Sequence, residues 1–229
     1  MQEIHLSPTG IKDFLSCSMR LAYRIAFKKE GEEGEKTEKM KIGLAVHETI
    51  EEAWRIPDPA VNLKYLNKYN LVEKKSVDKV KRSLSNYYQF YAQMLTERDV
   101  TERLFEYQFA KGITIVGKMD RVILERDTVI DWKTGDWLQK SIDDDIQFML
   151  YYMGYKKLYG REPKNVLYIN VNKNIVLRFK YEARNFRVLE KDIIPKVTRA
   201  LRTGDFHREG MFTGVCGNCP YKTVCWREA

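Results

Sequence analysis

The chain has 229 residues, 44% of them hydrophobic, so it can bury a sizeable core and does not require a second domain. Its 40 Lys and Arg residues exceed its 32 Asp and Glu residues by eight, which favours polyanionic partners such as nucleic acid. Residues 1–9 lack the apolar core of a signal peptide, and no apolar run approaches the roughly 18 residues of a membrane helix. We therefore expect a cytoplasmic protein with no membrane partner.

Helical periodicity dominates the first hundred residues. Apolar side chains recur at spacings of three and four in four stretches, over residues 9–27, 40–54, 60–68 and 77–96. The first predicted helix carries Cys17 in its middle, and the second carries His47. Residues 28–39 contain no apolar side chain, so they are expected to form a mobile loop. We interpret residues 58–100 as a helical insertion that covers the core.

The periodicity changes after residue 100. Five β-rich segments predict strands, over residues 104–110, 113–124, 128–132, 165–171 and 175–181. Glu125-Arg-Asp127 and Asn172-Lys-Asn174 are expected to form turns between strands. A helix is predicted to open on the capping-box pattern Ser141-Ile-Asp-Asp144, and a last helix over residues 187–201 has a kink at Pro195. This order of elements predicts an α/β fold with a mixed central sheet flanked by helices.

Two acidic segments in the predicted hairpin carry the most specific pattern. They are Gly117-Lys-Met-Asp120-Arg and Ile130-Asp131-Trp-Lys133-Thr-Gly135. Alternate side chains of a strand share a face, so Asp131 and Lys133 point the same way and Asp120 lies on the neighbouring strand. Carboxylate ligands of this kind suit Mg²⁺ or Mn²⁺, and the lysine would serve an attacking water or a charged phosphate. An exposed cross-strand Asp and Lys pair is the alternative interpretation.

Four cysteines form a second candidate site. Cys216, Cys219 and Cys225 have the spacing Cys-x₂-Cys-x₅-Cys near the C-terminus, and Cys17 lies near the N-terminus. Four thiolates bind either Zn²⁺ or an iron-sulfur cluster, and the spacing alone does not choose between them. In a reducing compartment, two stable disulfides are not expected.

The acidic segments resemble the core signature of the RecB-like PD-(D/E)XK nucleases. In this chain Asp131-x-Lys133 stands in place of the commoner Glu-x-Lys, and Asp120 matches the preceding Gly-x-x-Asp motif. Gly43-Leu-Ala-Val-His47-Glu resembles the first motif of that family, in which a helix supplies a histidine ligand. The resemblance implies a restriction-endonuclease-like core in which His47, Asp120 and Asp131 bind Mg²⁺ or Mn²⁺ and Lys133 serves the water.

Further residues match the family pattern outside the hairpin. Gln147-Phe-Met-Leu-Tyr151 resembles the Gln-x-x-x-Tyr motif, which is associated with holding DNA. Glu106 lies on the strand before the hairpin, where the family often has an acidic residue, although a surface glutamate is the simpler interpretation. A chance Gln and Tyr pair on one helix face is the corresponding alternative for Gln147 and Tyr151.

The four cysteines resemble the 4Fe-4S domain of AddB-type helicase-nucleases and of CRISPR-associated RecB-like nucleases. In those families one cysteine precedes the nuclease core and three follow it, as Cys17 and the C-terminal trio do here. Ser18 stands where the families usually have proline. The resemblance implies one nuclease domain with its core at residues 41–203, and a 4Fe-4S cluster that joins residues 1–27 to 204–229. Zn²⁺ is the alternative occupant.

The resemblance implies a metal-dependent DNA nuclease, of exonuclease type, that acts on single strands or strand ends. Such enzymes serve recombination, repair, phage DNA metabolism or CRISPR adaptation, and the sequence does not favour one of these. Two alternatives stay open at this point. The first is a catalytically idle DNA-end-binding or scaffold module with a structural metal cluster. The second is an RNA-directed nuclease, because DNA and RNA present the same phosphates.

Overall fold

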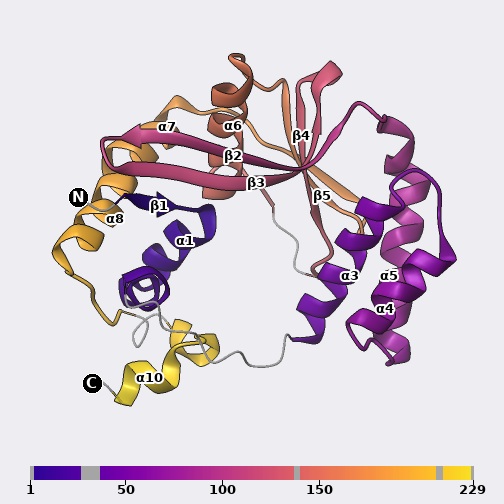
Figure 1. Ribbon diagram of the computed structural model, residues 1–229, viewed down its shortest axis with the longest axis horizontal. Helices are drawn as coiled ribbons and strands as arrows, with labels where there is room; N and C mark the ends of the chain where they lie inside the picture. Colours follow the sequence, from indigo (N-terminus) through magenta and orange to yellow (C-terminus); the bar gives the residue numbers. More distant parts are fainter. Residues whose placement is uncertain (1–2, 27–36, 137–139, 210–213, 228–229) are drawn as a thin grey trace.

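A six-stranded mixed sheet organises the chain (Figure 1). The computed structural model describes residues 3–26, 37–136, 140–209 and 214–227. The strands of the sheet are β1 (Ile4–Leu6), β2 (Val100–Ala110), β3 (Ile113–Ile123), β4 (Thr128–Lys133), β5 (Asn165–Asn170) and β6 (Ile175–Arg178). They follow the order β1-β3-β4-β5-β6, and β2 pairs with β3. The pairs β1 with β3 and β4 with β5 are parallel and the others antiparallel, which confirms the mixed sheet.

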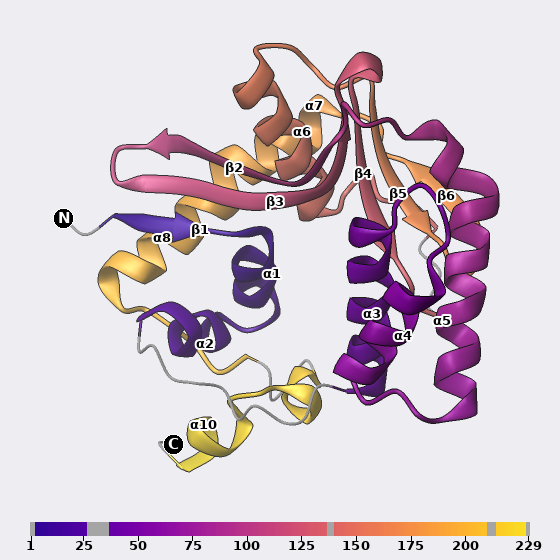
Figure 2. The ribbon, with the colours of Figure 1, turned by 45° about the vertical axis from the view of Figure 1, so that its right-hand side comes forward.

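Helices cover both faces of the sheet (Figure 2). On one face lie α3 (Glu38–Glu52), α4 (Pro59–Lys68) and α5 (Lys74–Asn86), which continues through a π turn at Tyr87–Tyr91 and a 3-10 turn at Ala92–Met94. Their apolar side chains share a core with Ile130, Trp132 and Ile169 of the sheet. On the other face lie α1 (Pro8–Ser16), α6 (Ile146–Tyr159), α7 (Ala183–Val188), α8 (Ile194–Thr203) and the π turn Leu189–Ile193.

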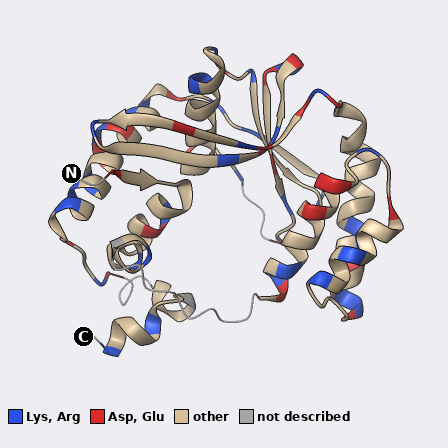
Figure 3. Ribbon diagram, viewed as in Figure 1, with Lys and Arg blue, Asp and Glu red and all other residues tan. Residues whose placement is uncertain are grey.

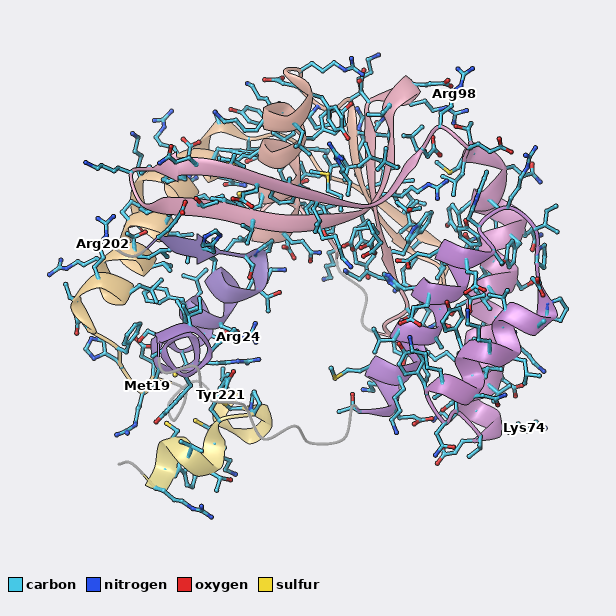
Figure 4. All side chains as sticks on the ribbon, in the orientation of Figure 1. Met19, Arg24, Lys74, Arg98, Arg202 and Tyr221 are labelled. Carbon is cyan, nitrogen blue, oxygen red and sulfur yellow. The ribbon has the colours of Figure 1, made fainter. Side chains whose placement is uncertain are left out.

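The two ends of the chain meet beside α1. There α2 (Ser18–Leu21) and the π turn Ala22–Ala26 lie next to the 3-10 turn Val215–Asn218 and α10 (Lys222–Arg227) (Figures 1 and 2). Figure 4 shows Met19, Arg24 and Tyr221 in this region, and the Tyr221 ring stacks on the Tyr23 ring with centroids 5.6 Å apart. Across the described ranges, no helix combines the length and apolarity that a membrane span requires.

The helix predicted over residues 9–27 is wrong at its centre. Cys17 has extended backbone angles (φ −169°, ψ 114°), so it separates α1 from α2 instead of lying inside one helix. Contacts from the C-terminal segment stabilise this break: the Met19 amide and the Ser18 hydroxyl both donate to the His207 carbonyl. Residue 27 and most of the loop predicted over residues 28–39 lie outside the described residues.

Two later helices also begin at unexpected places. The capping-box prediction at Ser141 is wrong: α6 begins at Ile146, and the Asp145 side chain caps it by accepting from the Gln147 amide. Ser141 accepts only a local hydrogen bond from the Asp143 amide. The last predicted helix starts earlier, at Ala183 in α7, and a π turn at Leu189–Ile193 precedes the proline-containing α8.

Candidate functional site

The candidate site forms where β3 and β4 separate. The two strands pair only from Arg121–Ile123 to Thr128–Ile130, and beyond this ladder they diverge. Asp120 lies just beyond the ladder, where its Oδ2 accepts a hydrogen bond of 2.9 Å from the Trp132 amide. The carboxylate therefore satisfies a backbone donor that the divergence leaves without a strand partner. This contact fixes Asp120 beside the Asp131-Trp132-Lys133 segment, as the hairpin prediction requires.

Asp131 is the buried centre of the site, with 1% of its surface exposed. Its Oδ2 lies 2.6 Å from the Lys133 Nζ, which confirms that the two side chains share one face of β4. Its Oδ1 accepts hydrogen bonds from the Gln147 amide nitrogen at 2.8 Å and from the Tyr151 hydroxyl at 3.3 Å. Gln147 also donates to the Tyr151 hydroxyl at 2.8 Å. Both carboxylate oxygens of Asp131 are thus held in place.

Burial and neighbouring charges shift the pKa values of Asp131 and Lys133. Removal from water raises the pKa of Asp131 to about 6, and the nearby Lys133 offsets only part of this effect. Burial also lowers the pKa of Lys133, but its side chain is 36% exposed, and the Asp131, Asp120 and Asp145 carboxylates together raise that pKa above its usual value. Lys133 therefore carries a proton in this arrangement.

Helix α3 places His47 on the opposite face of β4 from Asp131. The His47 Nε2 lies 2.8 Å from the Trp132 carbonyl oxygen, to which it donates, and its Nδ1 lies 3.6 Å from the Asp120 Oδ2. Gly43, one turn earlier, allows this approach, because a Cβ there would lie 3.3 Å from the Thr134 hydroxyl. The Gly-x-x-x-His spacing therefore has a physical cause, since both residues lie on the helix face that contacts the end of β4.

Glu51 belongs to the same region and escaped the sequence analysis. It lies one turn after His47 on α3, where Figure 3 shows acidic positions close to the strands. With His47 and Asp120 it lines a cavity of about 10 Å³, which is the size of one water. Burial raises the pKa of Glu51, and the charges of Lys118 and His47 lower it in part. The i, i+4 spacing from His47 is the signal that identifies it.

Glu106 lies apart from the acidic centre. It faces solvent on β2 opposite Val116, and it lines a pocket of about 670 Å³ together with Gln147 and Tyr151. Gln147 and Tyr151 of the predicted motif therefore face both the acidic site and this pocket. Its hydrogen bonds join it to Asp131, and its remaining surface lines the pocket beside Glu106.

All four cysteines line one small apolar pocket between the ends of the chain. Burial raises the pKa of the Cys219 thiol, and a hydrogen bond from the Tyr221 backbone and the charge of Arg20 offset this effect in part. Cys17 donates to the His207 carbonyl oxygen, with a sulfur to oxygen distance of 3.5 Å. The structure thus brings the four predicted ligands together across almost the whole chain.

Among the described residues, neither the acidic site at Asp120 and Asp131 nor the cysteine site has its side chains arranged as ligands around a metal. Over the part of the chain that the structure describes, no three His, Cys, Asp or Glu side chains are arranged as a metal site. The two carboxylates instead contact hydrogen-bond donors of the protein, Lys133 at Asp131 and the Trp132 amide at Asp120, and the Cys17 thiol donates to a backbone carbonyl.

The mixed sheet brings Asp120 and the Asp131-x-Lys133 pair together where two strands separate, an arrangement of the kind that metal-dependent hydrolases use. The comparison with protein families agrees with this class. Residues 5–226 match the model of the PD-(D/E)XK nuclease superfamily, and the chain belongs to that superfamily.

A solved structure shares the fold at low sequence identity, and a second gives a weaker match. A crystal structure from Eubacterium rectale, of a protein named provisionally as an exonuclease, matches with a TM-score of 0.65 and 14% identity, covering 90% of this chain and 85% of that one. The crystal structure of SSO0001 matches with a TM-score of 0.46 and 14% identity, covering 98% and 87% of the two chains. No curated protein matches the sequence.

Proposed function

We propose that the protein is a metal-dependent deoxyribonuclease of the RecB-like branch of the superfamily, acting on single strands or strand ends as an exonuclease. The observation that carries this proposal is the convergence of four side chains on the backbone of Trp132. Asp120 and His47 bond its amide and carbonyl, and Asp131 and Lys133 flank it in sequence. An idle scaffold has no need of a paired Asp131 and Lys133 beside two further ligand-type side chains.

The donor set fits Mg²⁺ or Mn²⁺. His47, Asp120 and Asp131 would hold the ion, because carboxylate oxygens suit these cations and the His47 Nδ1 lies 3.6 Å from the Asp120 Oδ2. That distance is within reach of two ligands of one ion, since metal to ligand bonds are about 2.0–2.2 Å long. When bound, the ion supplies a polarised phosphate oxygen and an activated water.

In this proposal, Lys133 stabilises negative charge on the substrate. Its raised pKa keeps the ammonium protonated, so it is suited to stabilise the negative charge that develops on the scissile phosphate. The Lys133 Nζ lies 2.6 Å from the Asp131 Oδ2, beside the proposed ion. We therefore assign Lys133 the role of positioning the phosphate and the water.

Gln147 and Tyr151 are positioning residues for Asp131. Both donate to its Oδ1, which leaves Oδ2 toward Lys133. Their loss is therefore expected to misplace the buried carboxylate as well as to weaken DNA contacts. The family association with DNA and the geometry at Asp131 are compatible, because the same helix face borders the pocket at Glu106.

Cleavage of end-labelled nucleic acids tests the proposal directly. The purified protein is incubated with single-stranded DNA, duplex DNA and matching RNA, in Mg²⁺, Mn²⁺ or EDTA. We expect cleavage of DNA that requires metal, its loss in Lys133→Ala, and unchanged cleavage in Lys75→Ala, an exposed lysine of α5. Folded protein that cleaves no substrate with either metal would establish the scaffold alternative, and preference for RNA would replace the DNA assignment.

We further propose that the four cysteines bind a 4Fe-4S cluster that joins residues 1–27 to 204–229 around the nuclease core. The support is their shared pocket, an apolar space enclosed by α2, the 3-10 turn and α10. Soft thiolates suit iron-sulfur clusters and Zn²⁺ alike, and metal binding there would be coupled to the folding of both ends.

Metal and sulfide analysis separates these occupants. Protein purified without oxygen is expected to contain iron and acid-labile sulfide and to show the visible absorption of a cluster. Cys219→Ala should lose all three and melt at a lower temperature, whereas Lys133→Ala should retain them while losing cleavage. Zinc without sulfide in the parent protein would replace the cluster by a zinc site.

A further inference from the structure

One edge of β3 is open between two neighbouring strands. Because β2 follows the other edge along the length of β3, β1 and β4 must share the remaining one. There β1 pairs with Ile113–Ile115 and β4 with Arg121–Ile123. Residues 116–120, all of them described, have no paired strand beside them on this edge. In Figures 1 and 2, β1 lies near the hairpin turn of β3 and β4 leaves from the opposite end.

The pocket of about 670 Å³ lies at this open edge. Three parts of the fold contribute its walls: the junction of β1 and α1, the β2–β3 hairpin and α6. The wall residues that matter here are Thr9, Leu104, Glu106, Val116, Gln147 and Tyr151. The volume is in the range of pockets that bind small organic groups, which is about 300–1,000 Å³.

The pocket is continuous with the candidate catalytic site. Gln147 and Tyr151 line it, and the same two side chains donate to the Asp131 Oδ1. At its other end, the open edge of β3 runs directly to Asp120. A group bound in the pocket is therefore separated from the catalytic carboxylate by a single layer of side chains.

The lining matches the chemistry of a nucleobase. Leu104 is 68% exposed and, with Val116, offers an apolar surface for the face of a ring. The Glu106 carboxylate, on the same strand as Leu104, offers hydrogen-bond acceptors for its polar edge. Bases within a duplex are stacked and paired, so only an unstacked base can present both a face and an edge to one pocket.

We propose that this pocket binds an unstacked base of the substrate strand, beside the phosphate at Asp131, and so makes the protein select single strands over duplexes. The inference rests on the proposed function and extends it by naming the group that decides the substrate class. Leu104 serves as the apolar platform, and Glu106 accepts hydrogen bonds from the edge of the base.

Binding measured without metal tests this inference independently of cleavage. Fluorescence anisotropy in EDTA compares a labelled single-stranded oligodeoxynucleotide with the corresponding blunt duplex. Leu104→Ala removes three carbon atoms of apolar contact, so we expect it to weaken single-strand binding about three- to tenfold, or about 0.6–1.4 kcal/mol, and to leave duplex binding unchanged. Leu63→Ala, which truncates a leucine of α4 that is 57% exposed, is the matched control and should bind like the parent.

An oligonucleotide that lacks its terminal bases provides the second comparison. A single-stranded oligonucleotide whose terminal nucleotides are abasic should bind the parent as weakly as the normal strand binds Leu104→Ala. Equal affinity of the parent for the abasic and normal strands would overturn the inference, and so would parent-like single-strand binding by a folded Leu104→Ala protein. Absence of cleavage in metal would refute the proposed nuclease activity alone, because neither binding comparison depends on cleavage.

Discussion

The glycine of the Gly117-x-x-Asp120 motif is predicted to be required by packing. The Phe105 ring, 2% exposed, lies between β3 and α6, and a Cβ on Gly117 would approach its Cζ to 2.3 Å. A Cβ on Gly154 of α6 would approach the same ring to 2.6 Å. Real Cβ atoms do not come this close, so Gly117→Ala must displace a ring that is held from both sides. The ring also contacts Tyr151 edge to face, with centroids 6.2 Å apart.

The magnitude follows from two opposing effects. Overpacking a well-packed core costs about 1–3 kcal/mol. Alanine also restricts the unfolded chain relative to glycine, which stabilises by about 0.4–1 kcal/mol. We therefore expect Gly117→Ala to lower the free energy of unfolding by about 1–2 kcal/mol, or a melting temperature shift of about 2–8 °C for a chain of this size. Gly135→Ala is the control, since nothing lies within 4 Å of its Cβ position.

A double-mutant cycle measured by chemical denaturation decides whether the ring is responsible. Phe105→Ala alone should cost about 3–5 kcal/mol by opening a cavity. Adding Gly117→Ala to that background should cost little or stabilise, because the new methyl group enters vacated space. If Gly117→Ala destabilises the Phe105→Ala protein as much as it destabilises the parent, the packing explanation is wrong and the glycine is needed for another reason.

Three further predictions follow from the site and the chain ends. Burial holds the pKa of Asp131 at about 6, above its unfolded value of 3.8, so the metal-free protein should lose stability as pH rises from about 4 to 6. Asp131→Asn should abolish that loss in denaturant titrations at several pH values. Ser18→Ala removes hydrogen bonds to His207 and should cost about 1–3 kcal/mol in thermal melts, whereas Ser16→Ala, whose bond is local, should cost less. Glu51→Gln should weaken Mn²⁺ binding measured by calorimetry, and an unchanged affinity would exclude Glu51 from the site.

The sequence predicted the arrangement along β4 because strand alternation is a local rule. Asp131 and Lys133 had to share a face, and Asp120 had to lie on the neighbouring strand. The alternation rule could not predict the contact between His47 and the Trp132 carbonyl. This contact depends on how α3 docks on the end of β4, which involves the packing of its apolar face against the sheet and the close approach of Gly43 to Thr134.

The wrong helix boundaries have a similar cause. Ser141 and Asp145 are both acceptable caps on local grounds, and tertiary contacts decide between them. The Asp143 side chain accepts from the Lys180 amide and its carbonyl accepts from the Asn185 side chain, which holds this segment in a non-helical form. Asp145 in turn forms an ion pair of 2.8 Å with Lys12 of α1. These partners lie far away in sequence, so the local pattern could not reveal them.

The position of the site at the end of β4 makes it depend on both helical layers. A strand presents alternate side chains to opposite faces, so Asp131 meets α6 while the neighbouring Trp132 packs toward α3 and α5. His47 and Asp120 lie 3.6 Å apart at the point where β3 has separated from β4. Loosening either helical layer would therefore move one half of the site relative to the other. This explains why residues with no role in the chemistry, such as Gly43 and Phe105, belong to the catalytic arrangement through packing alone.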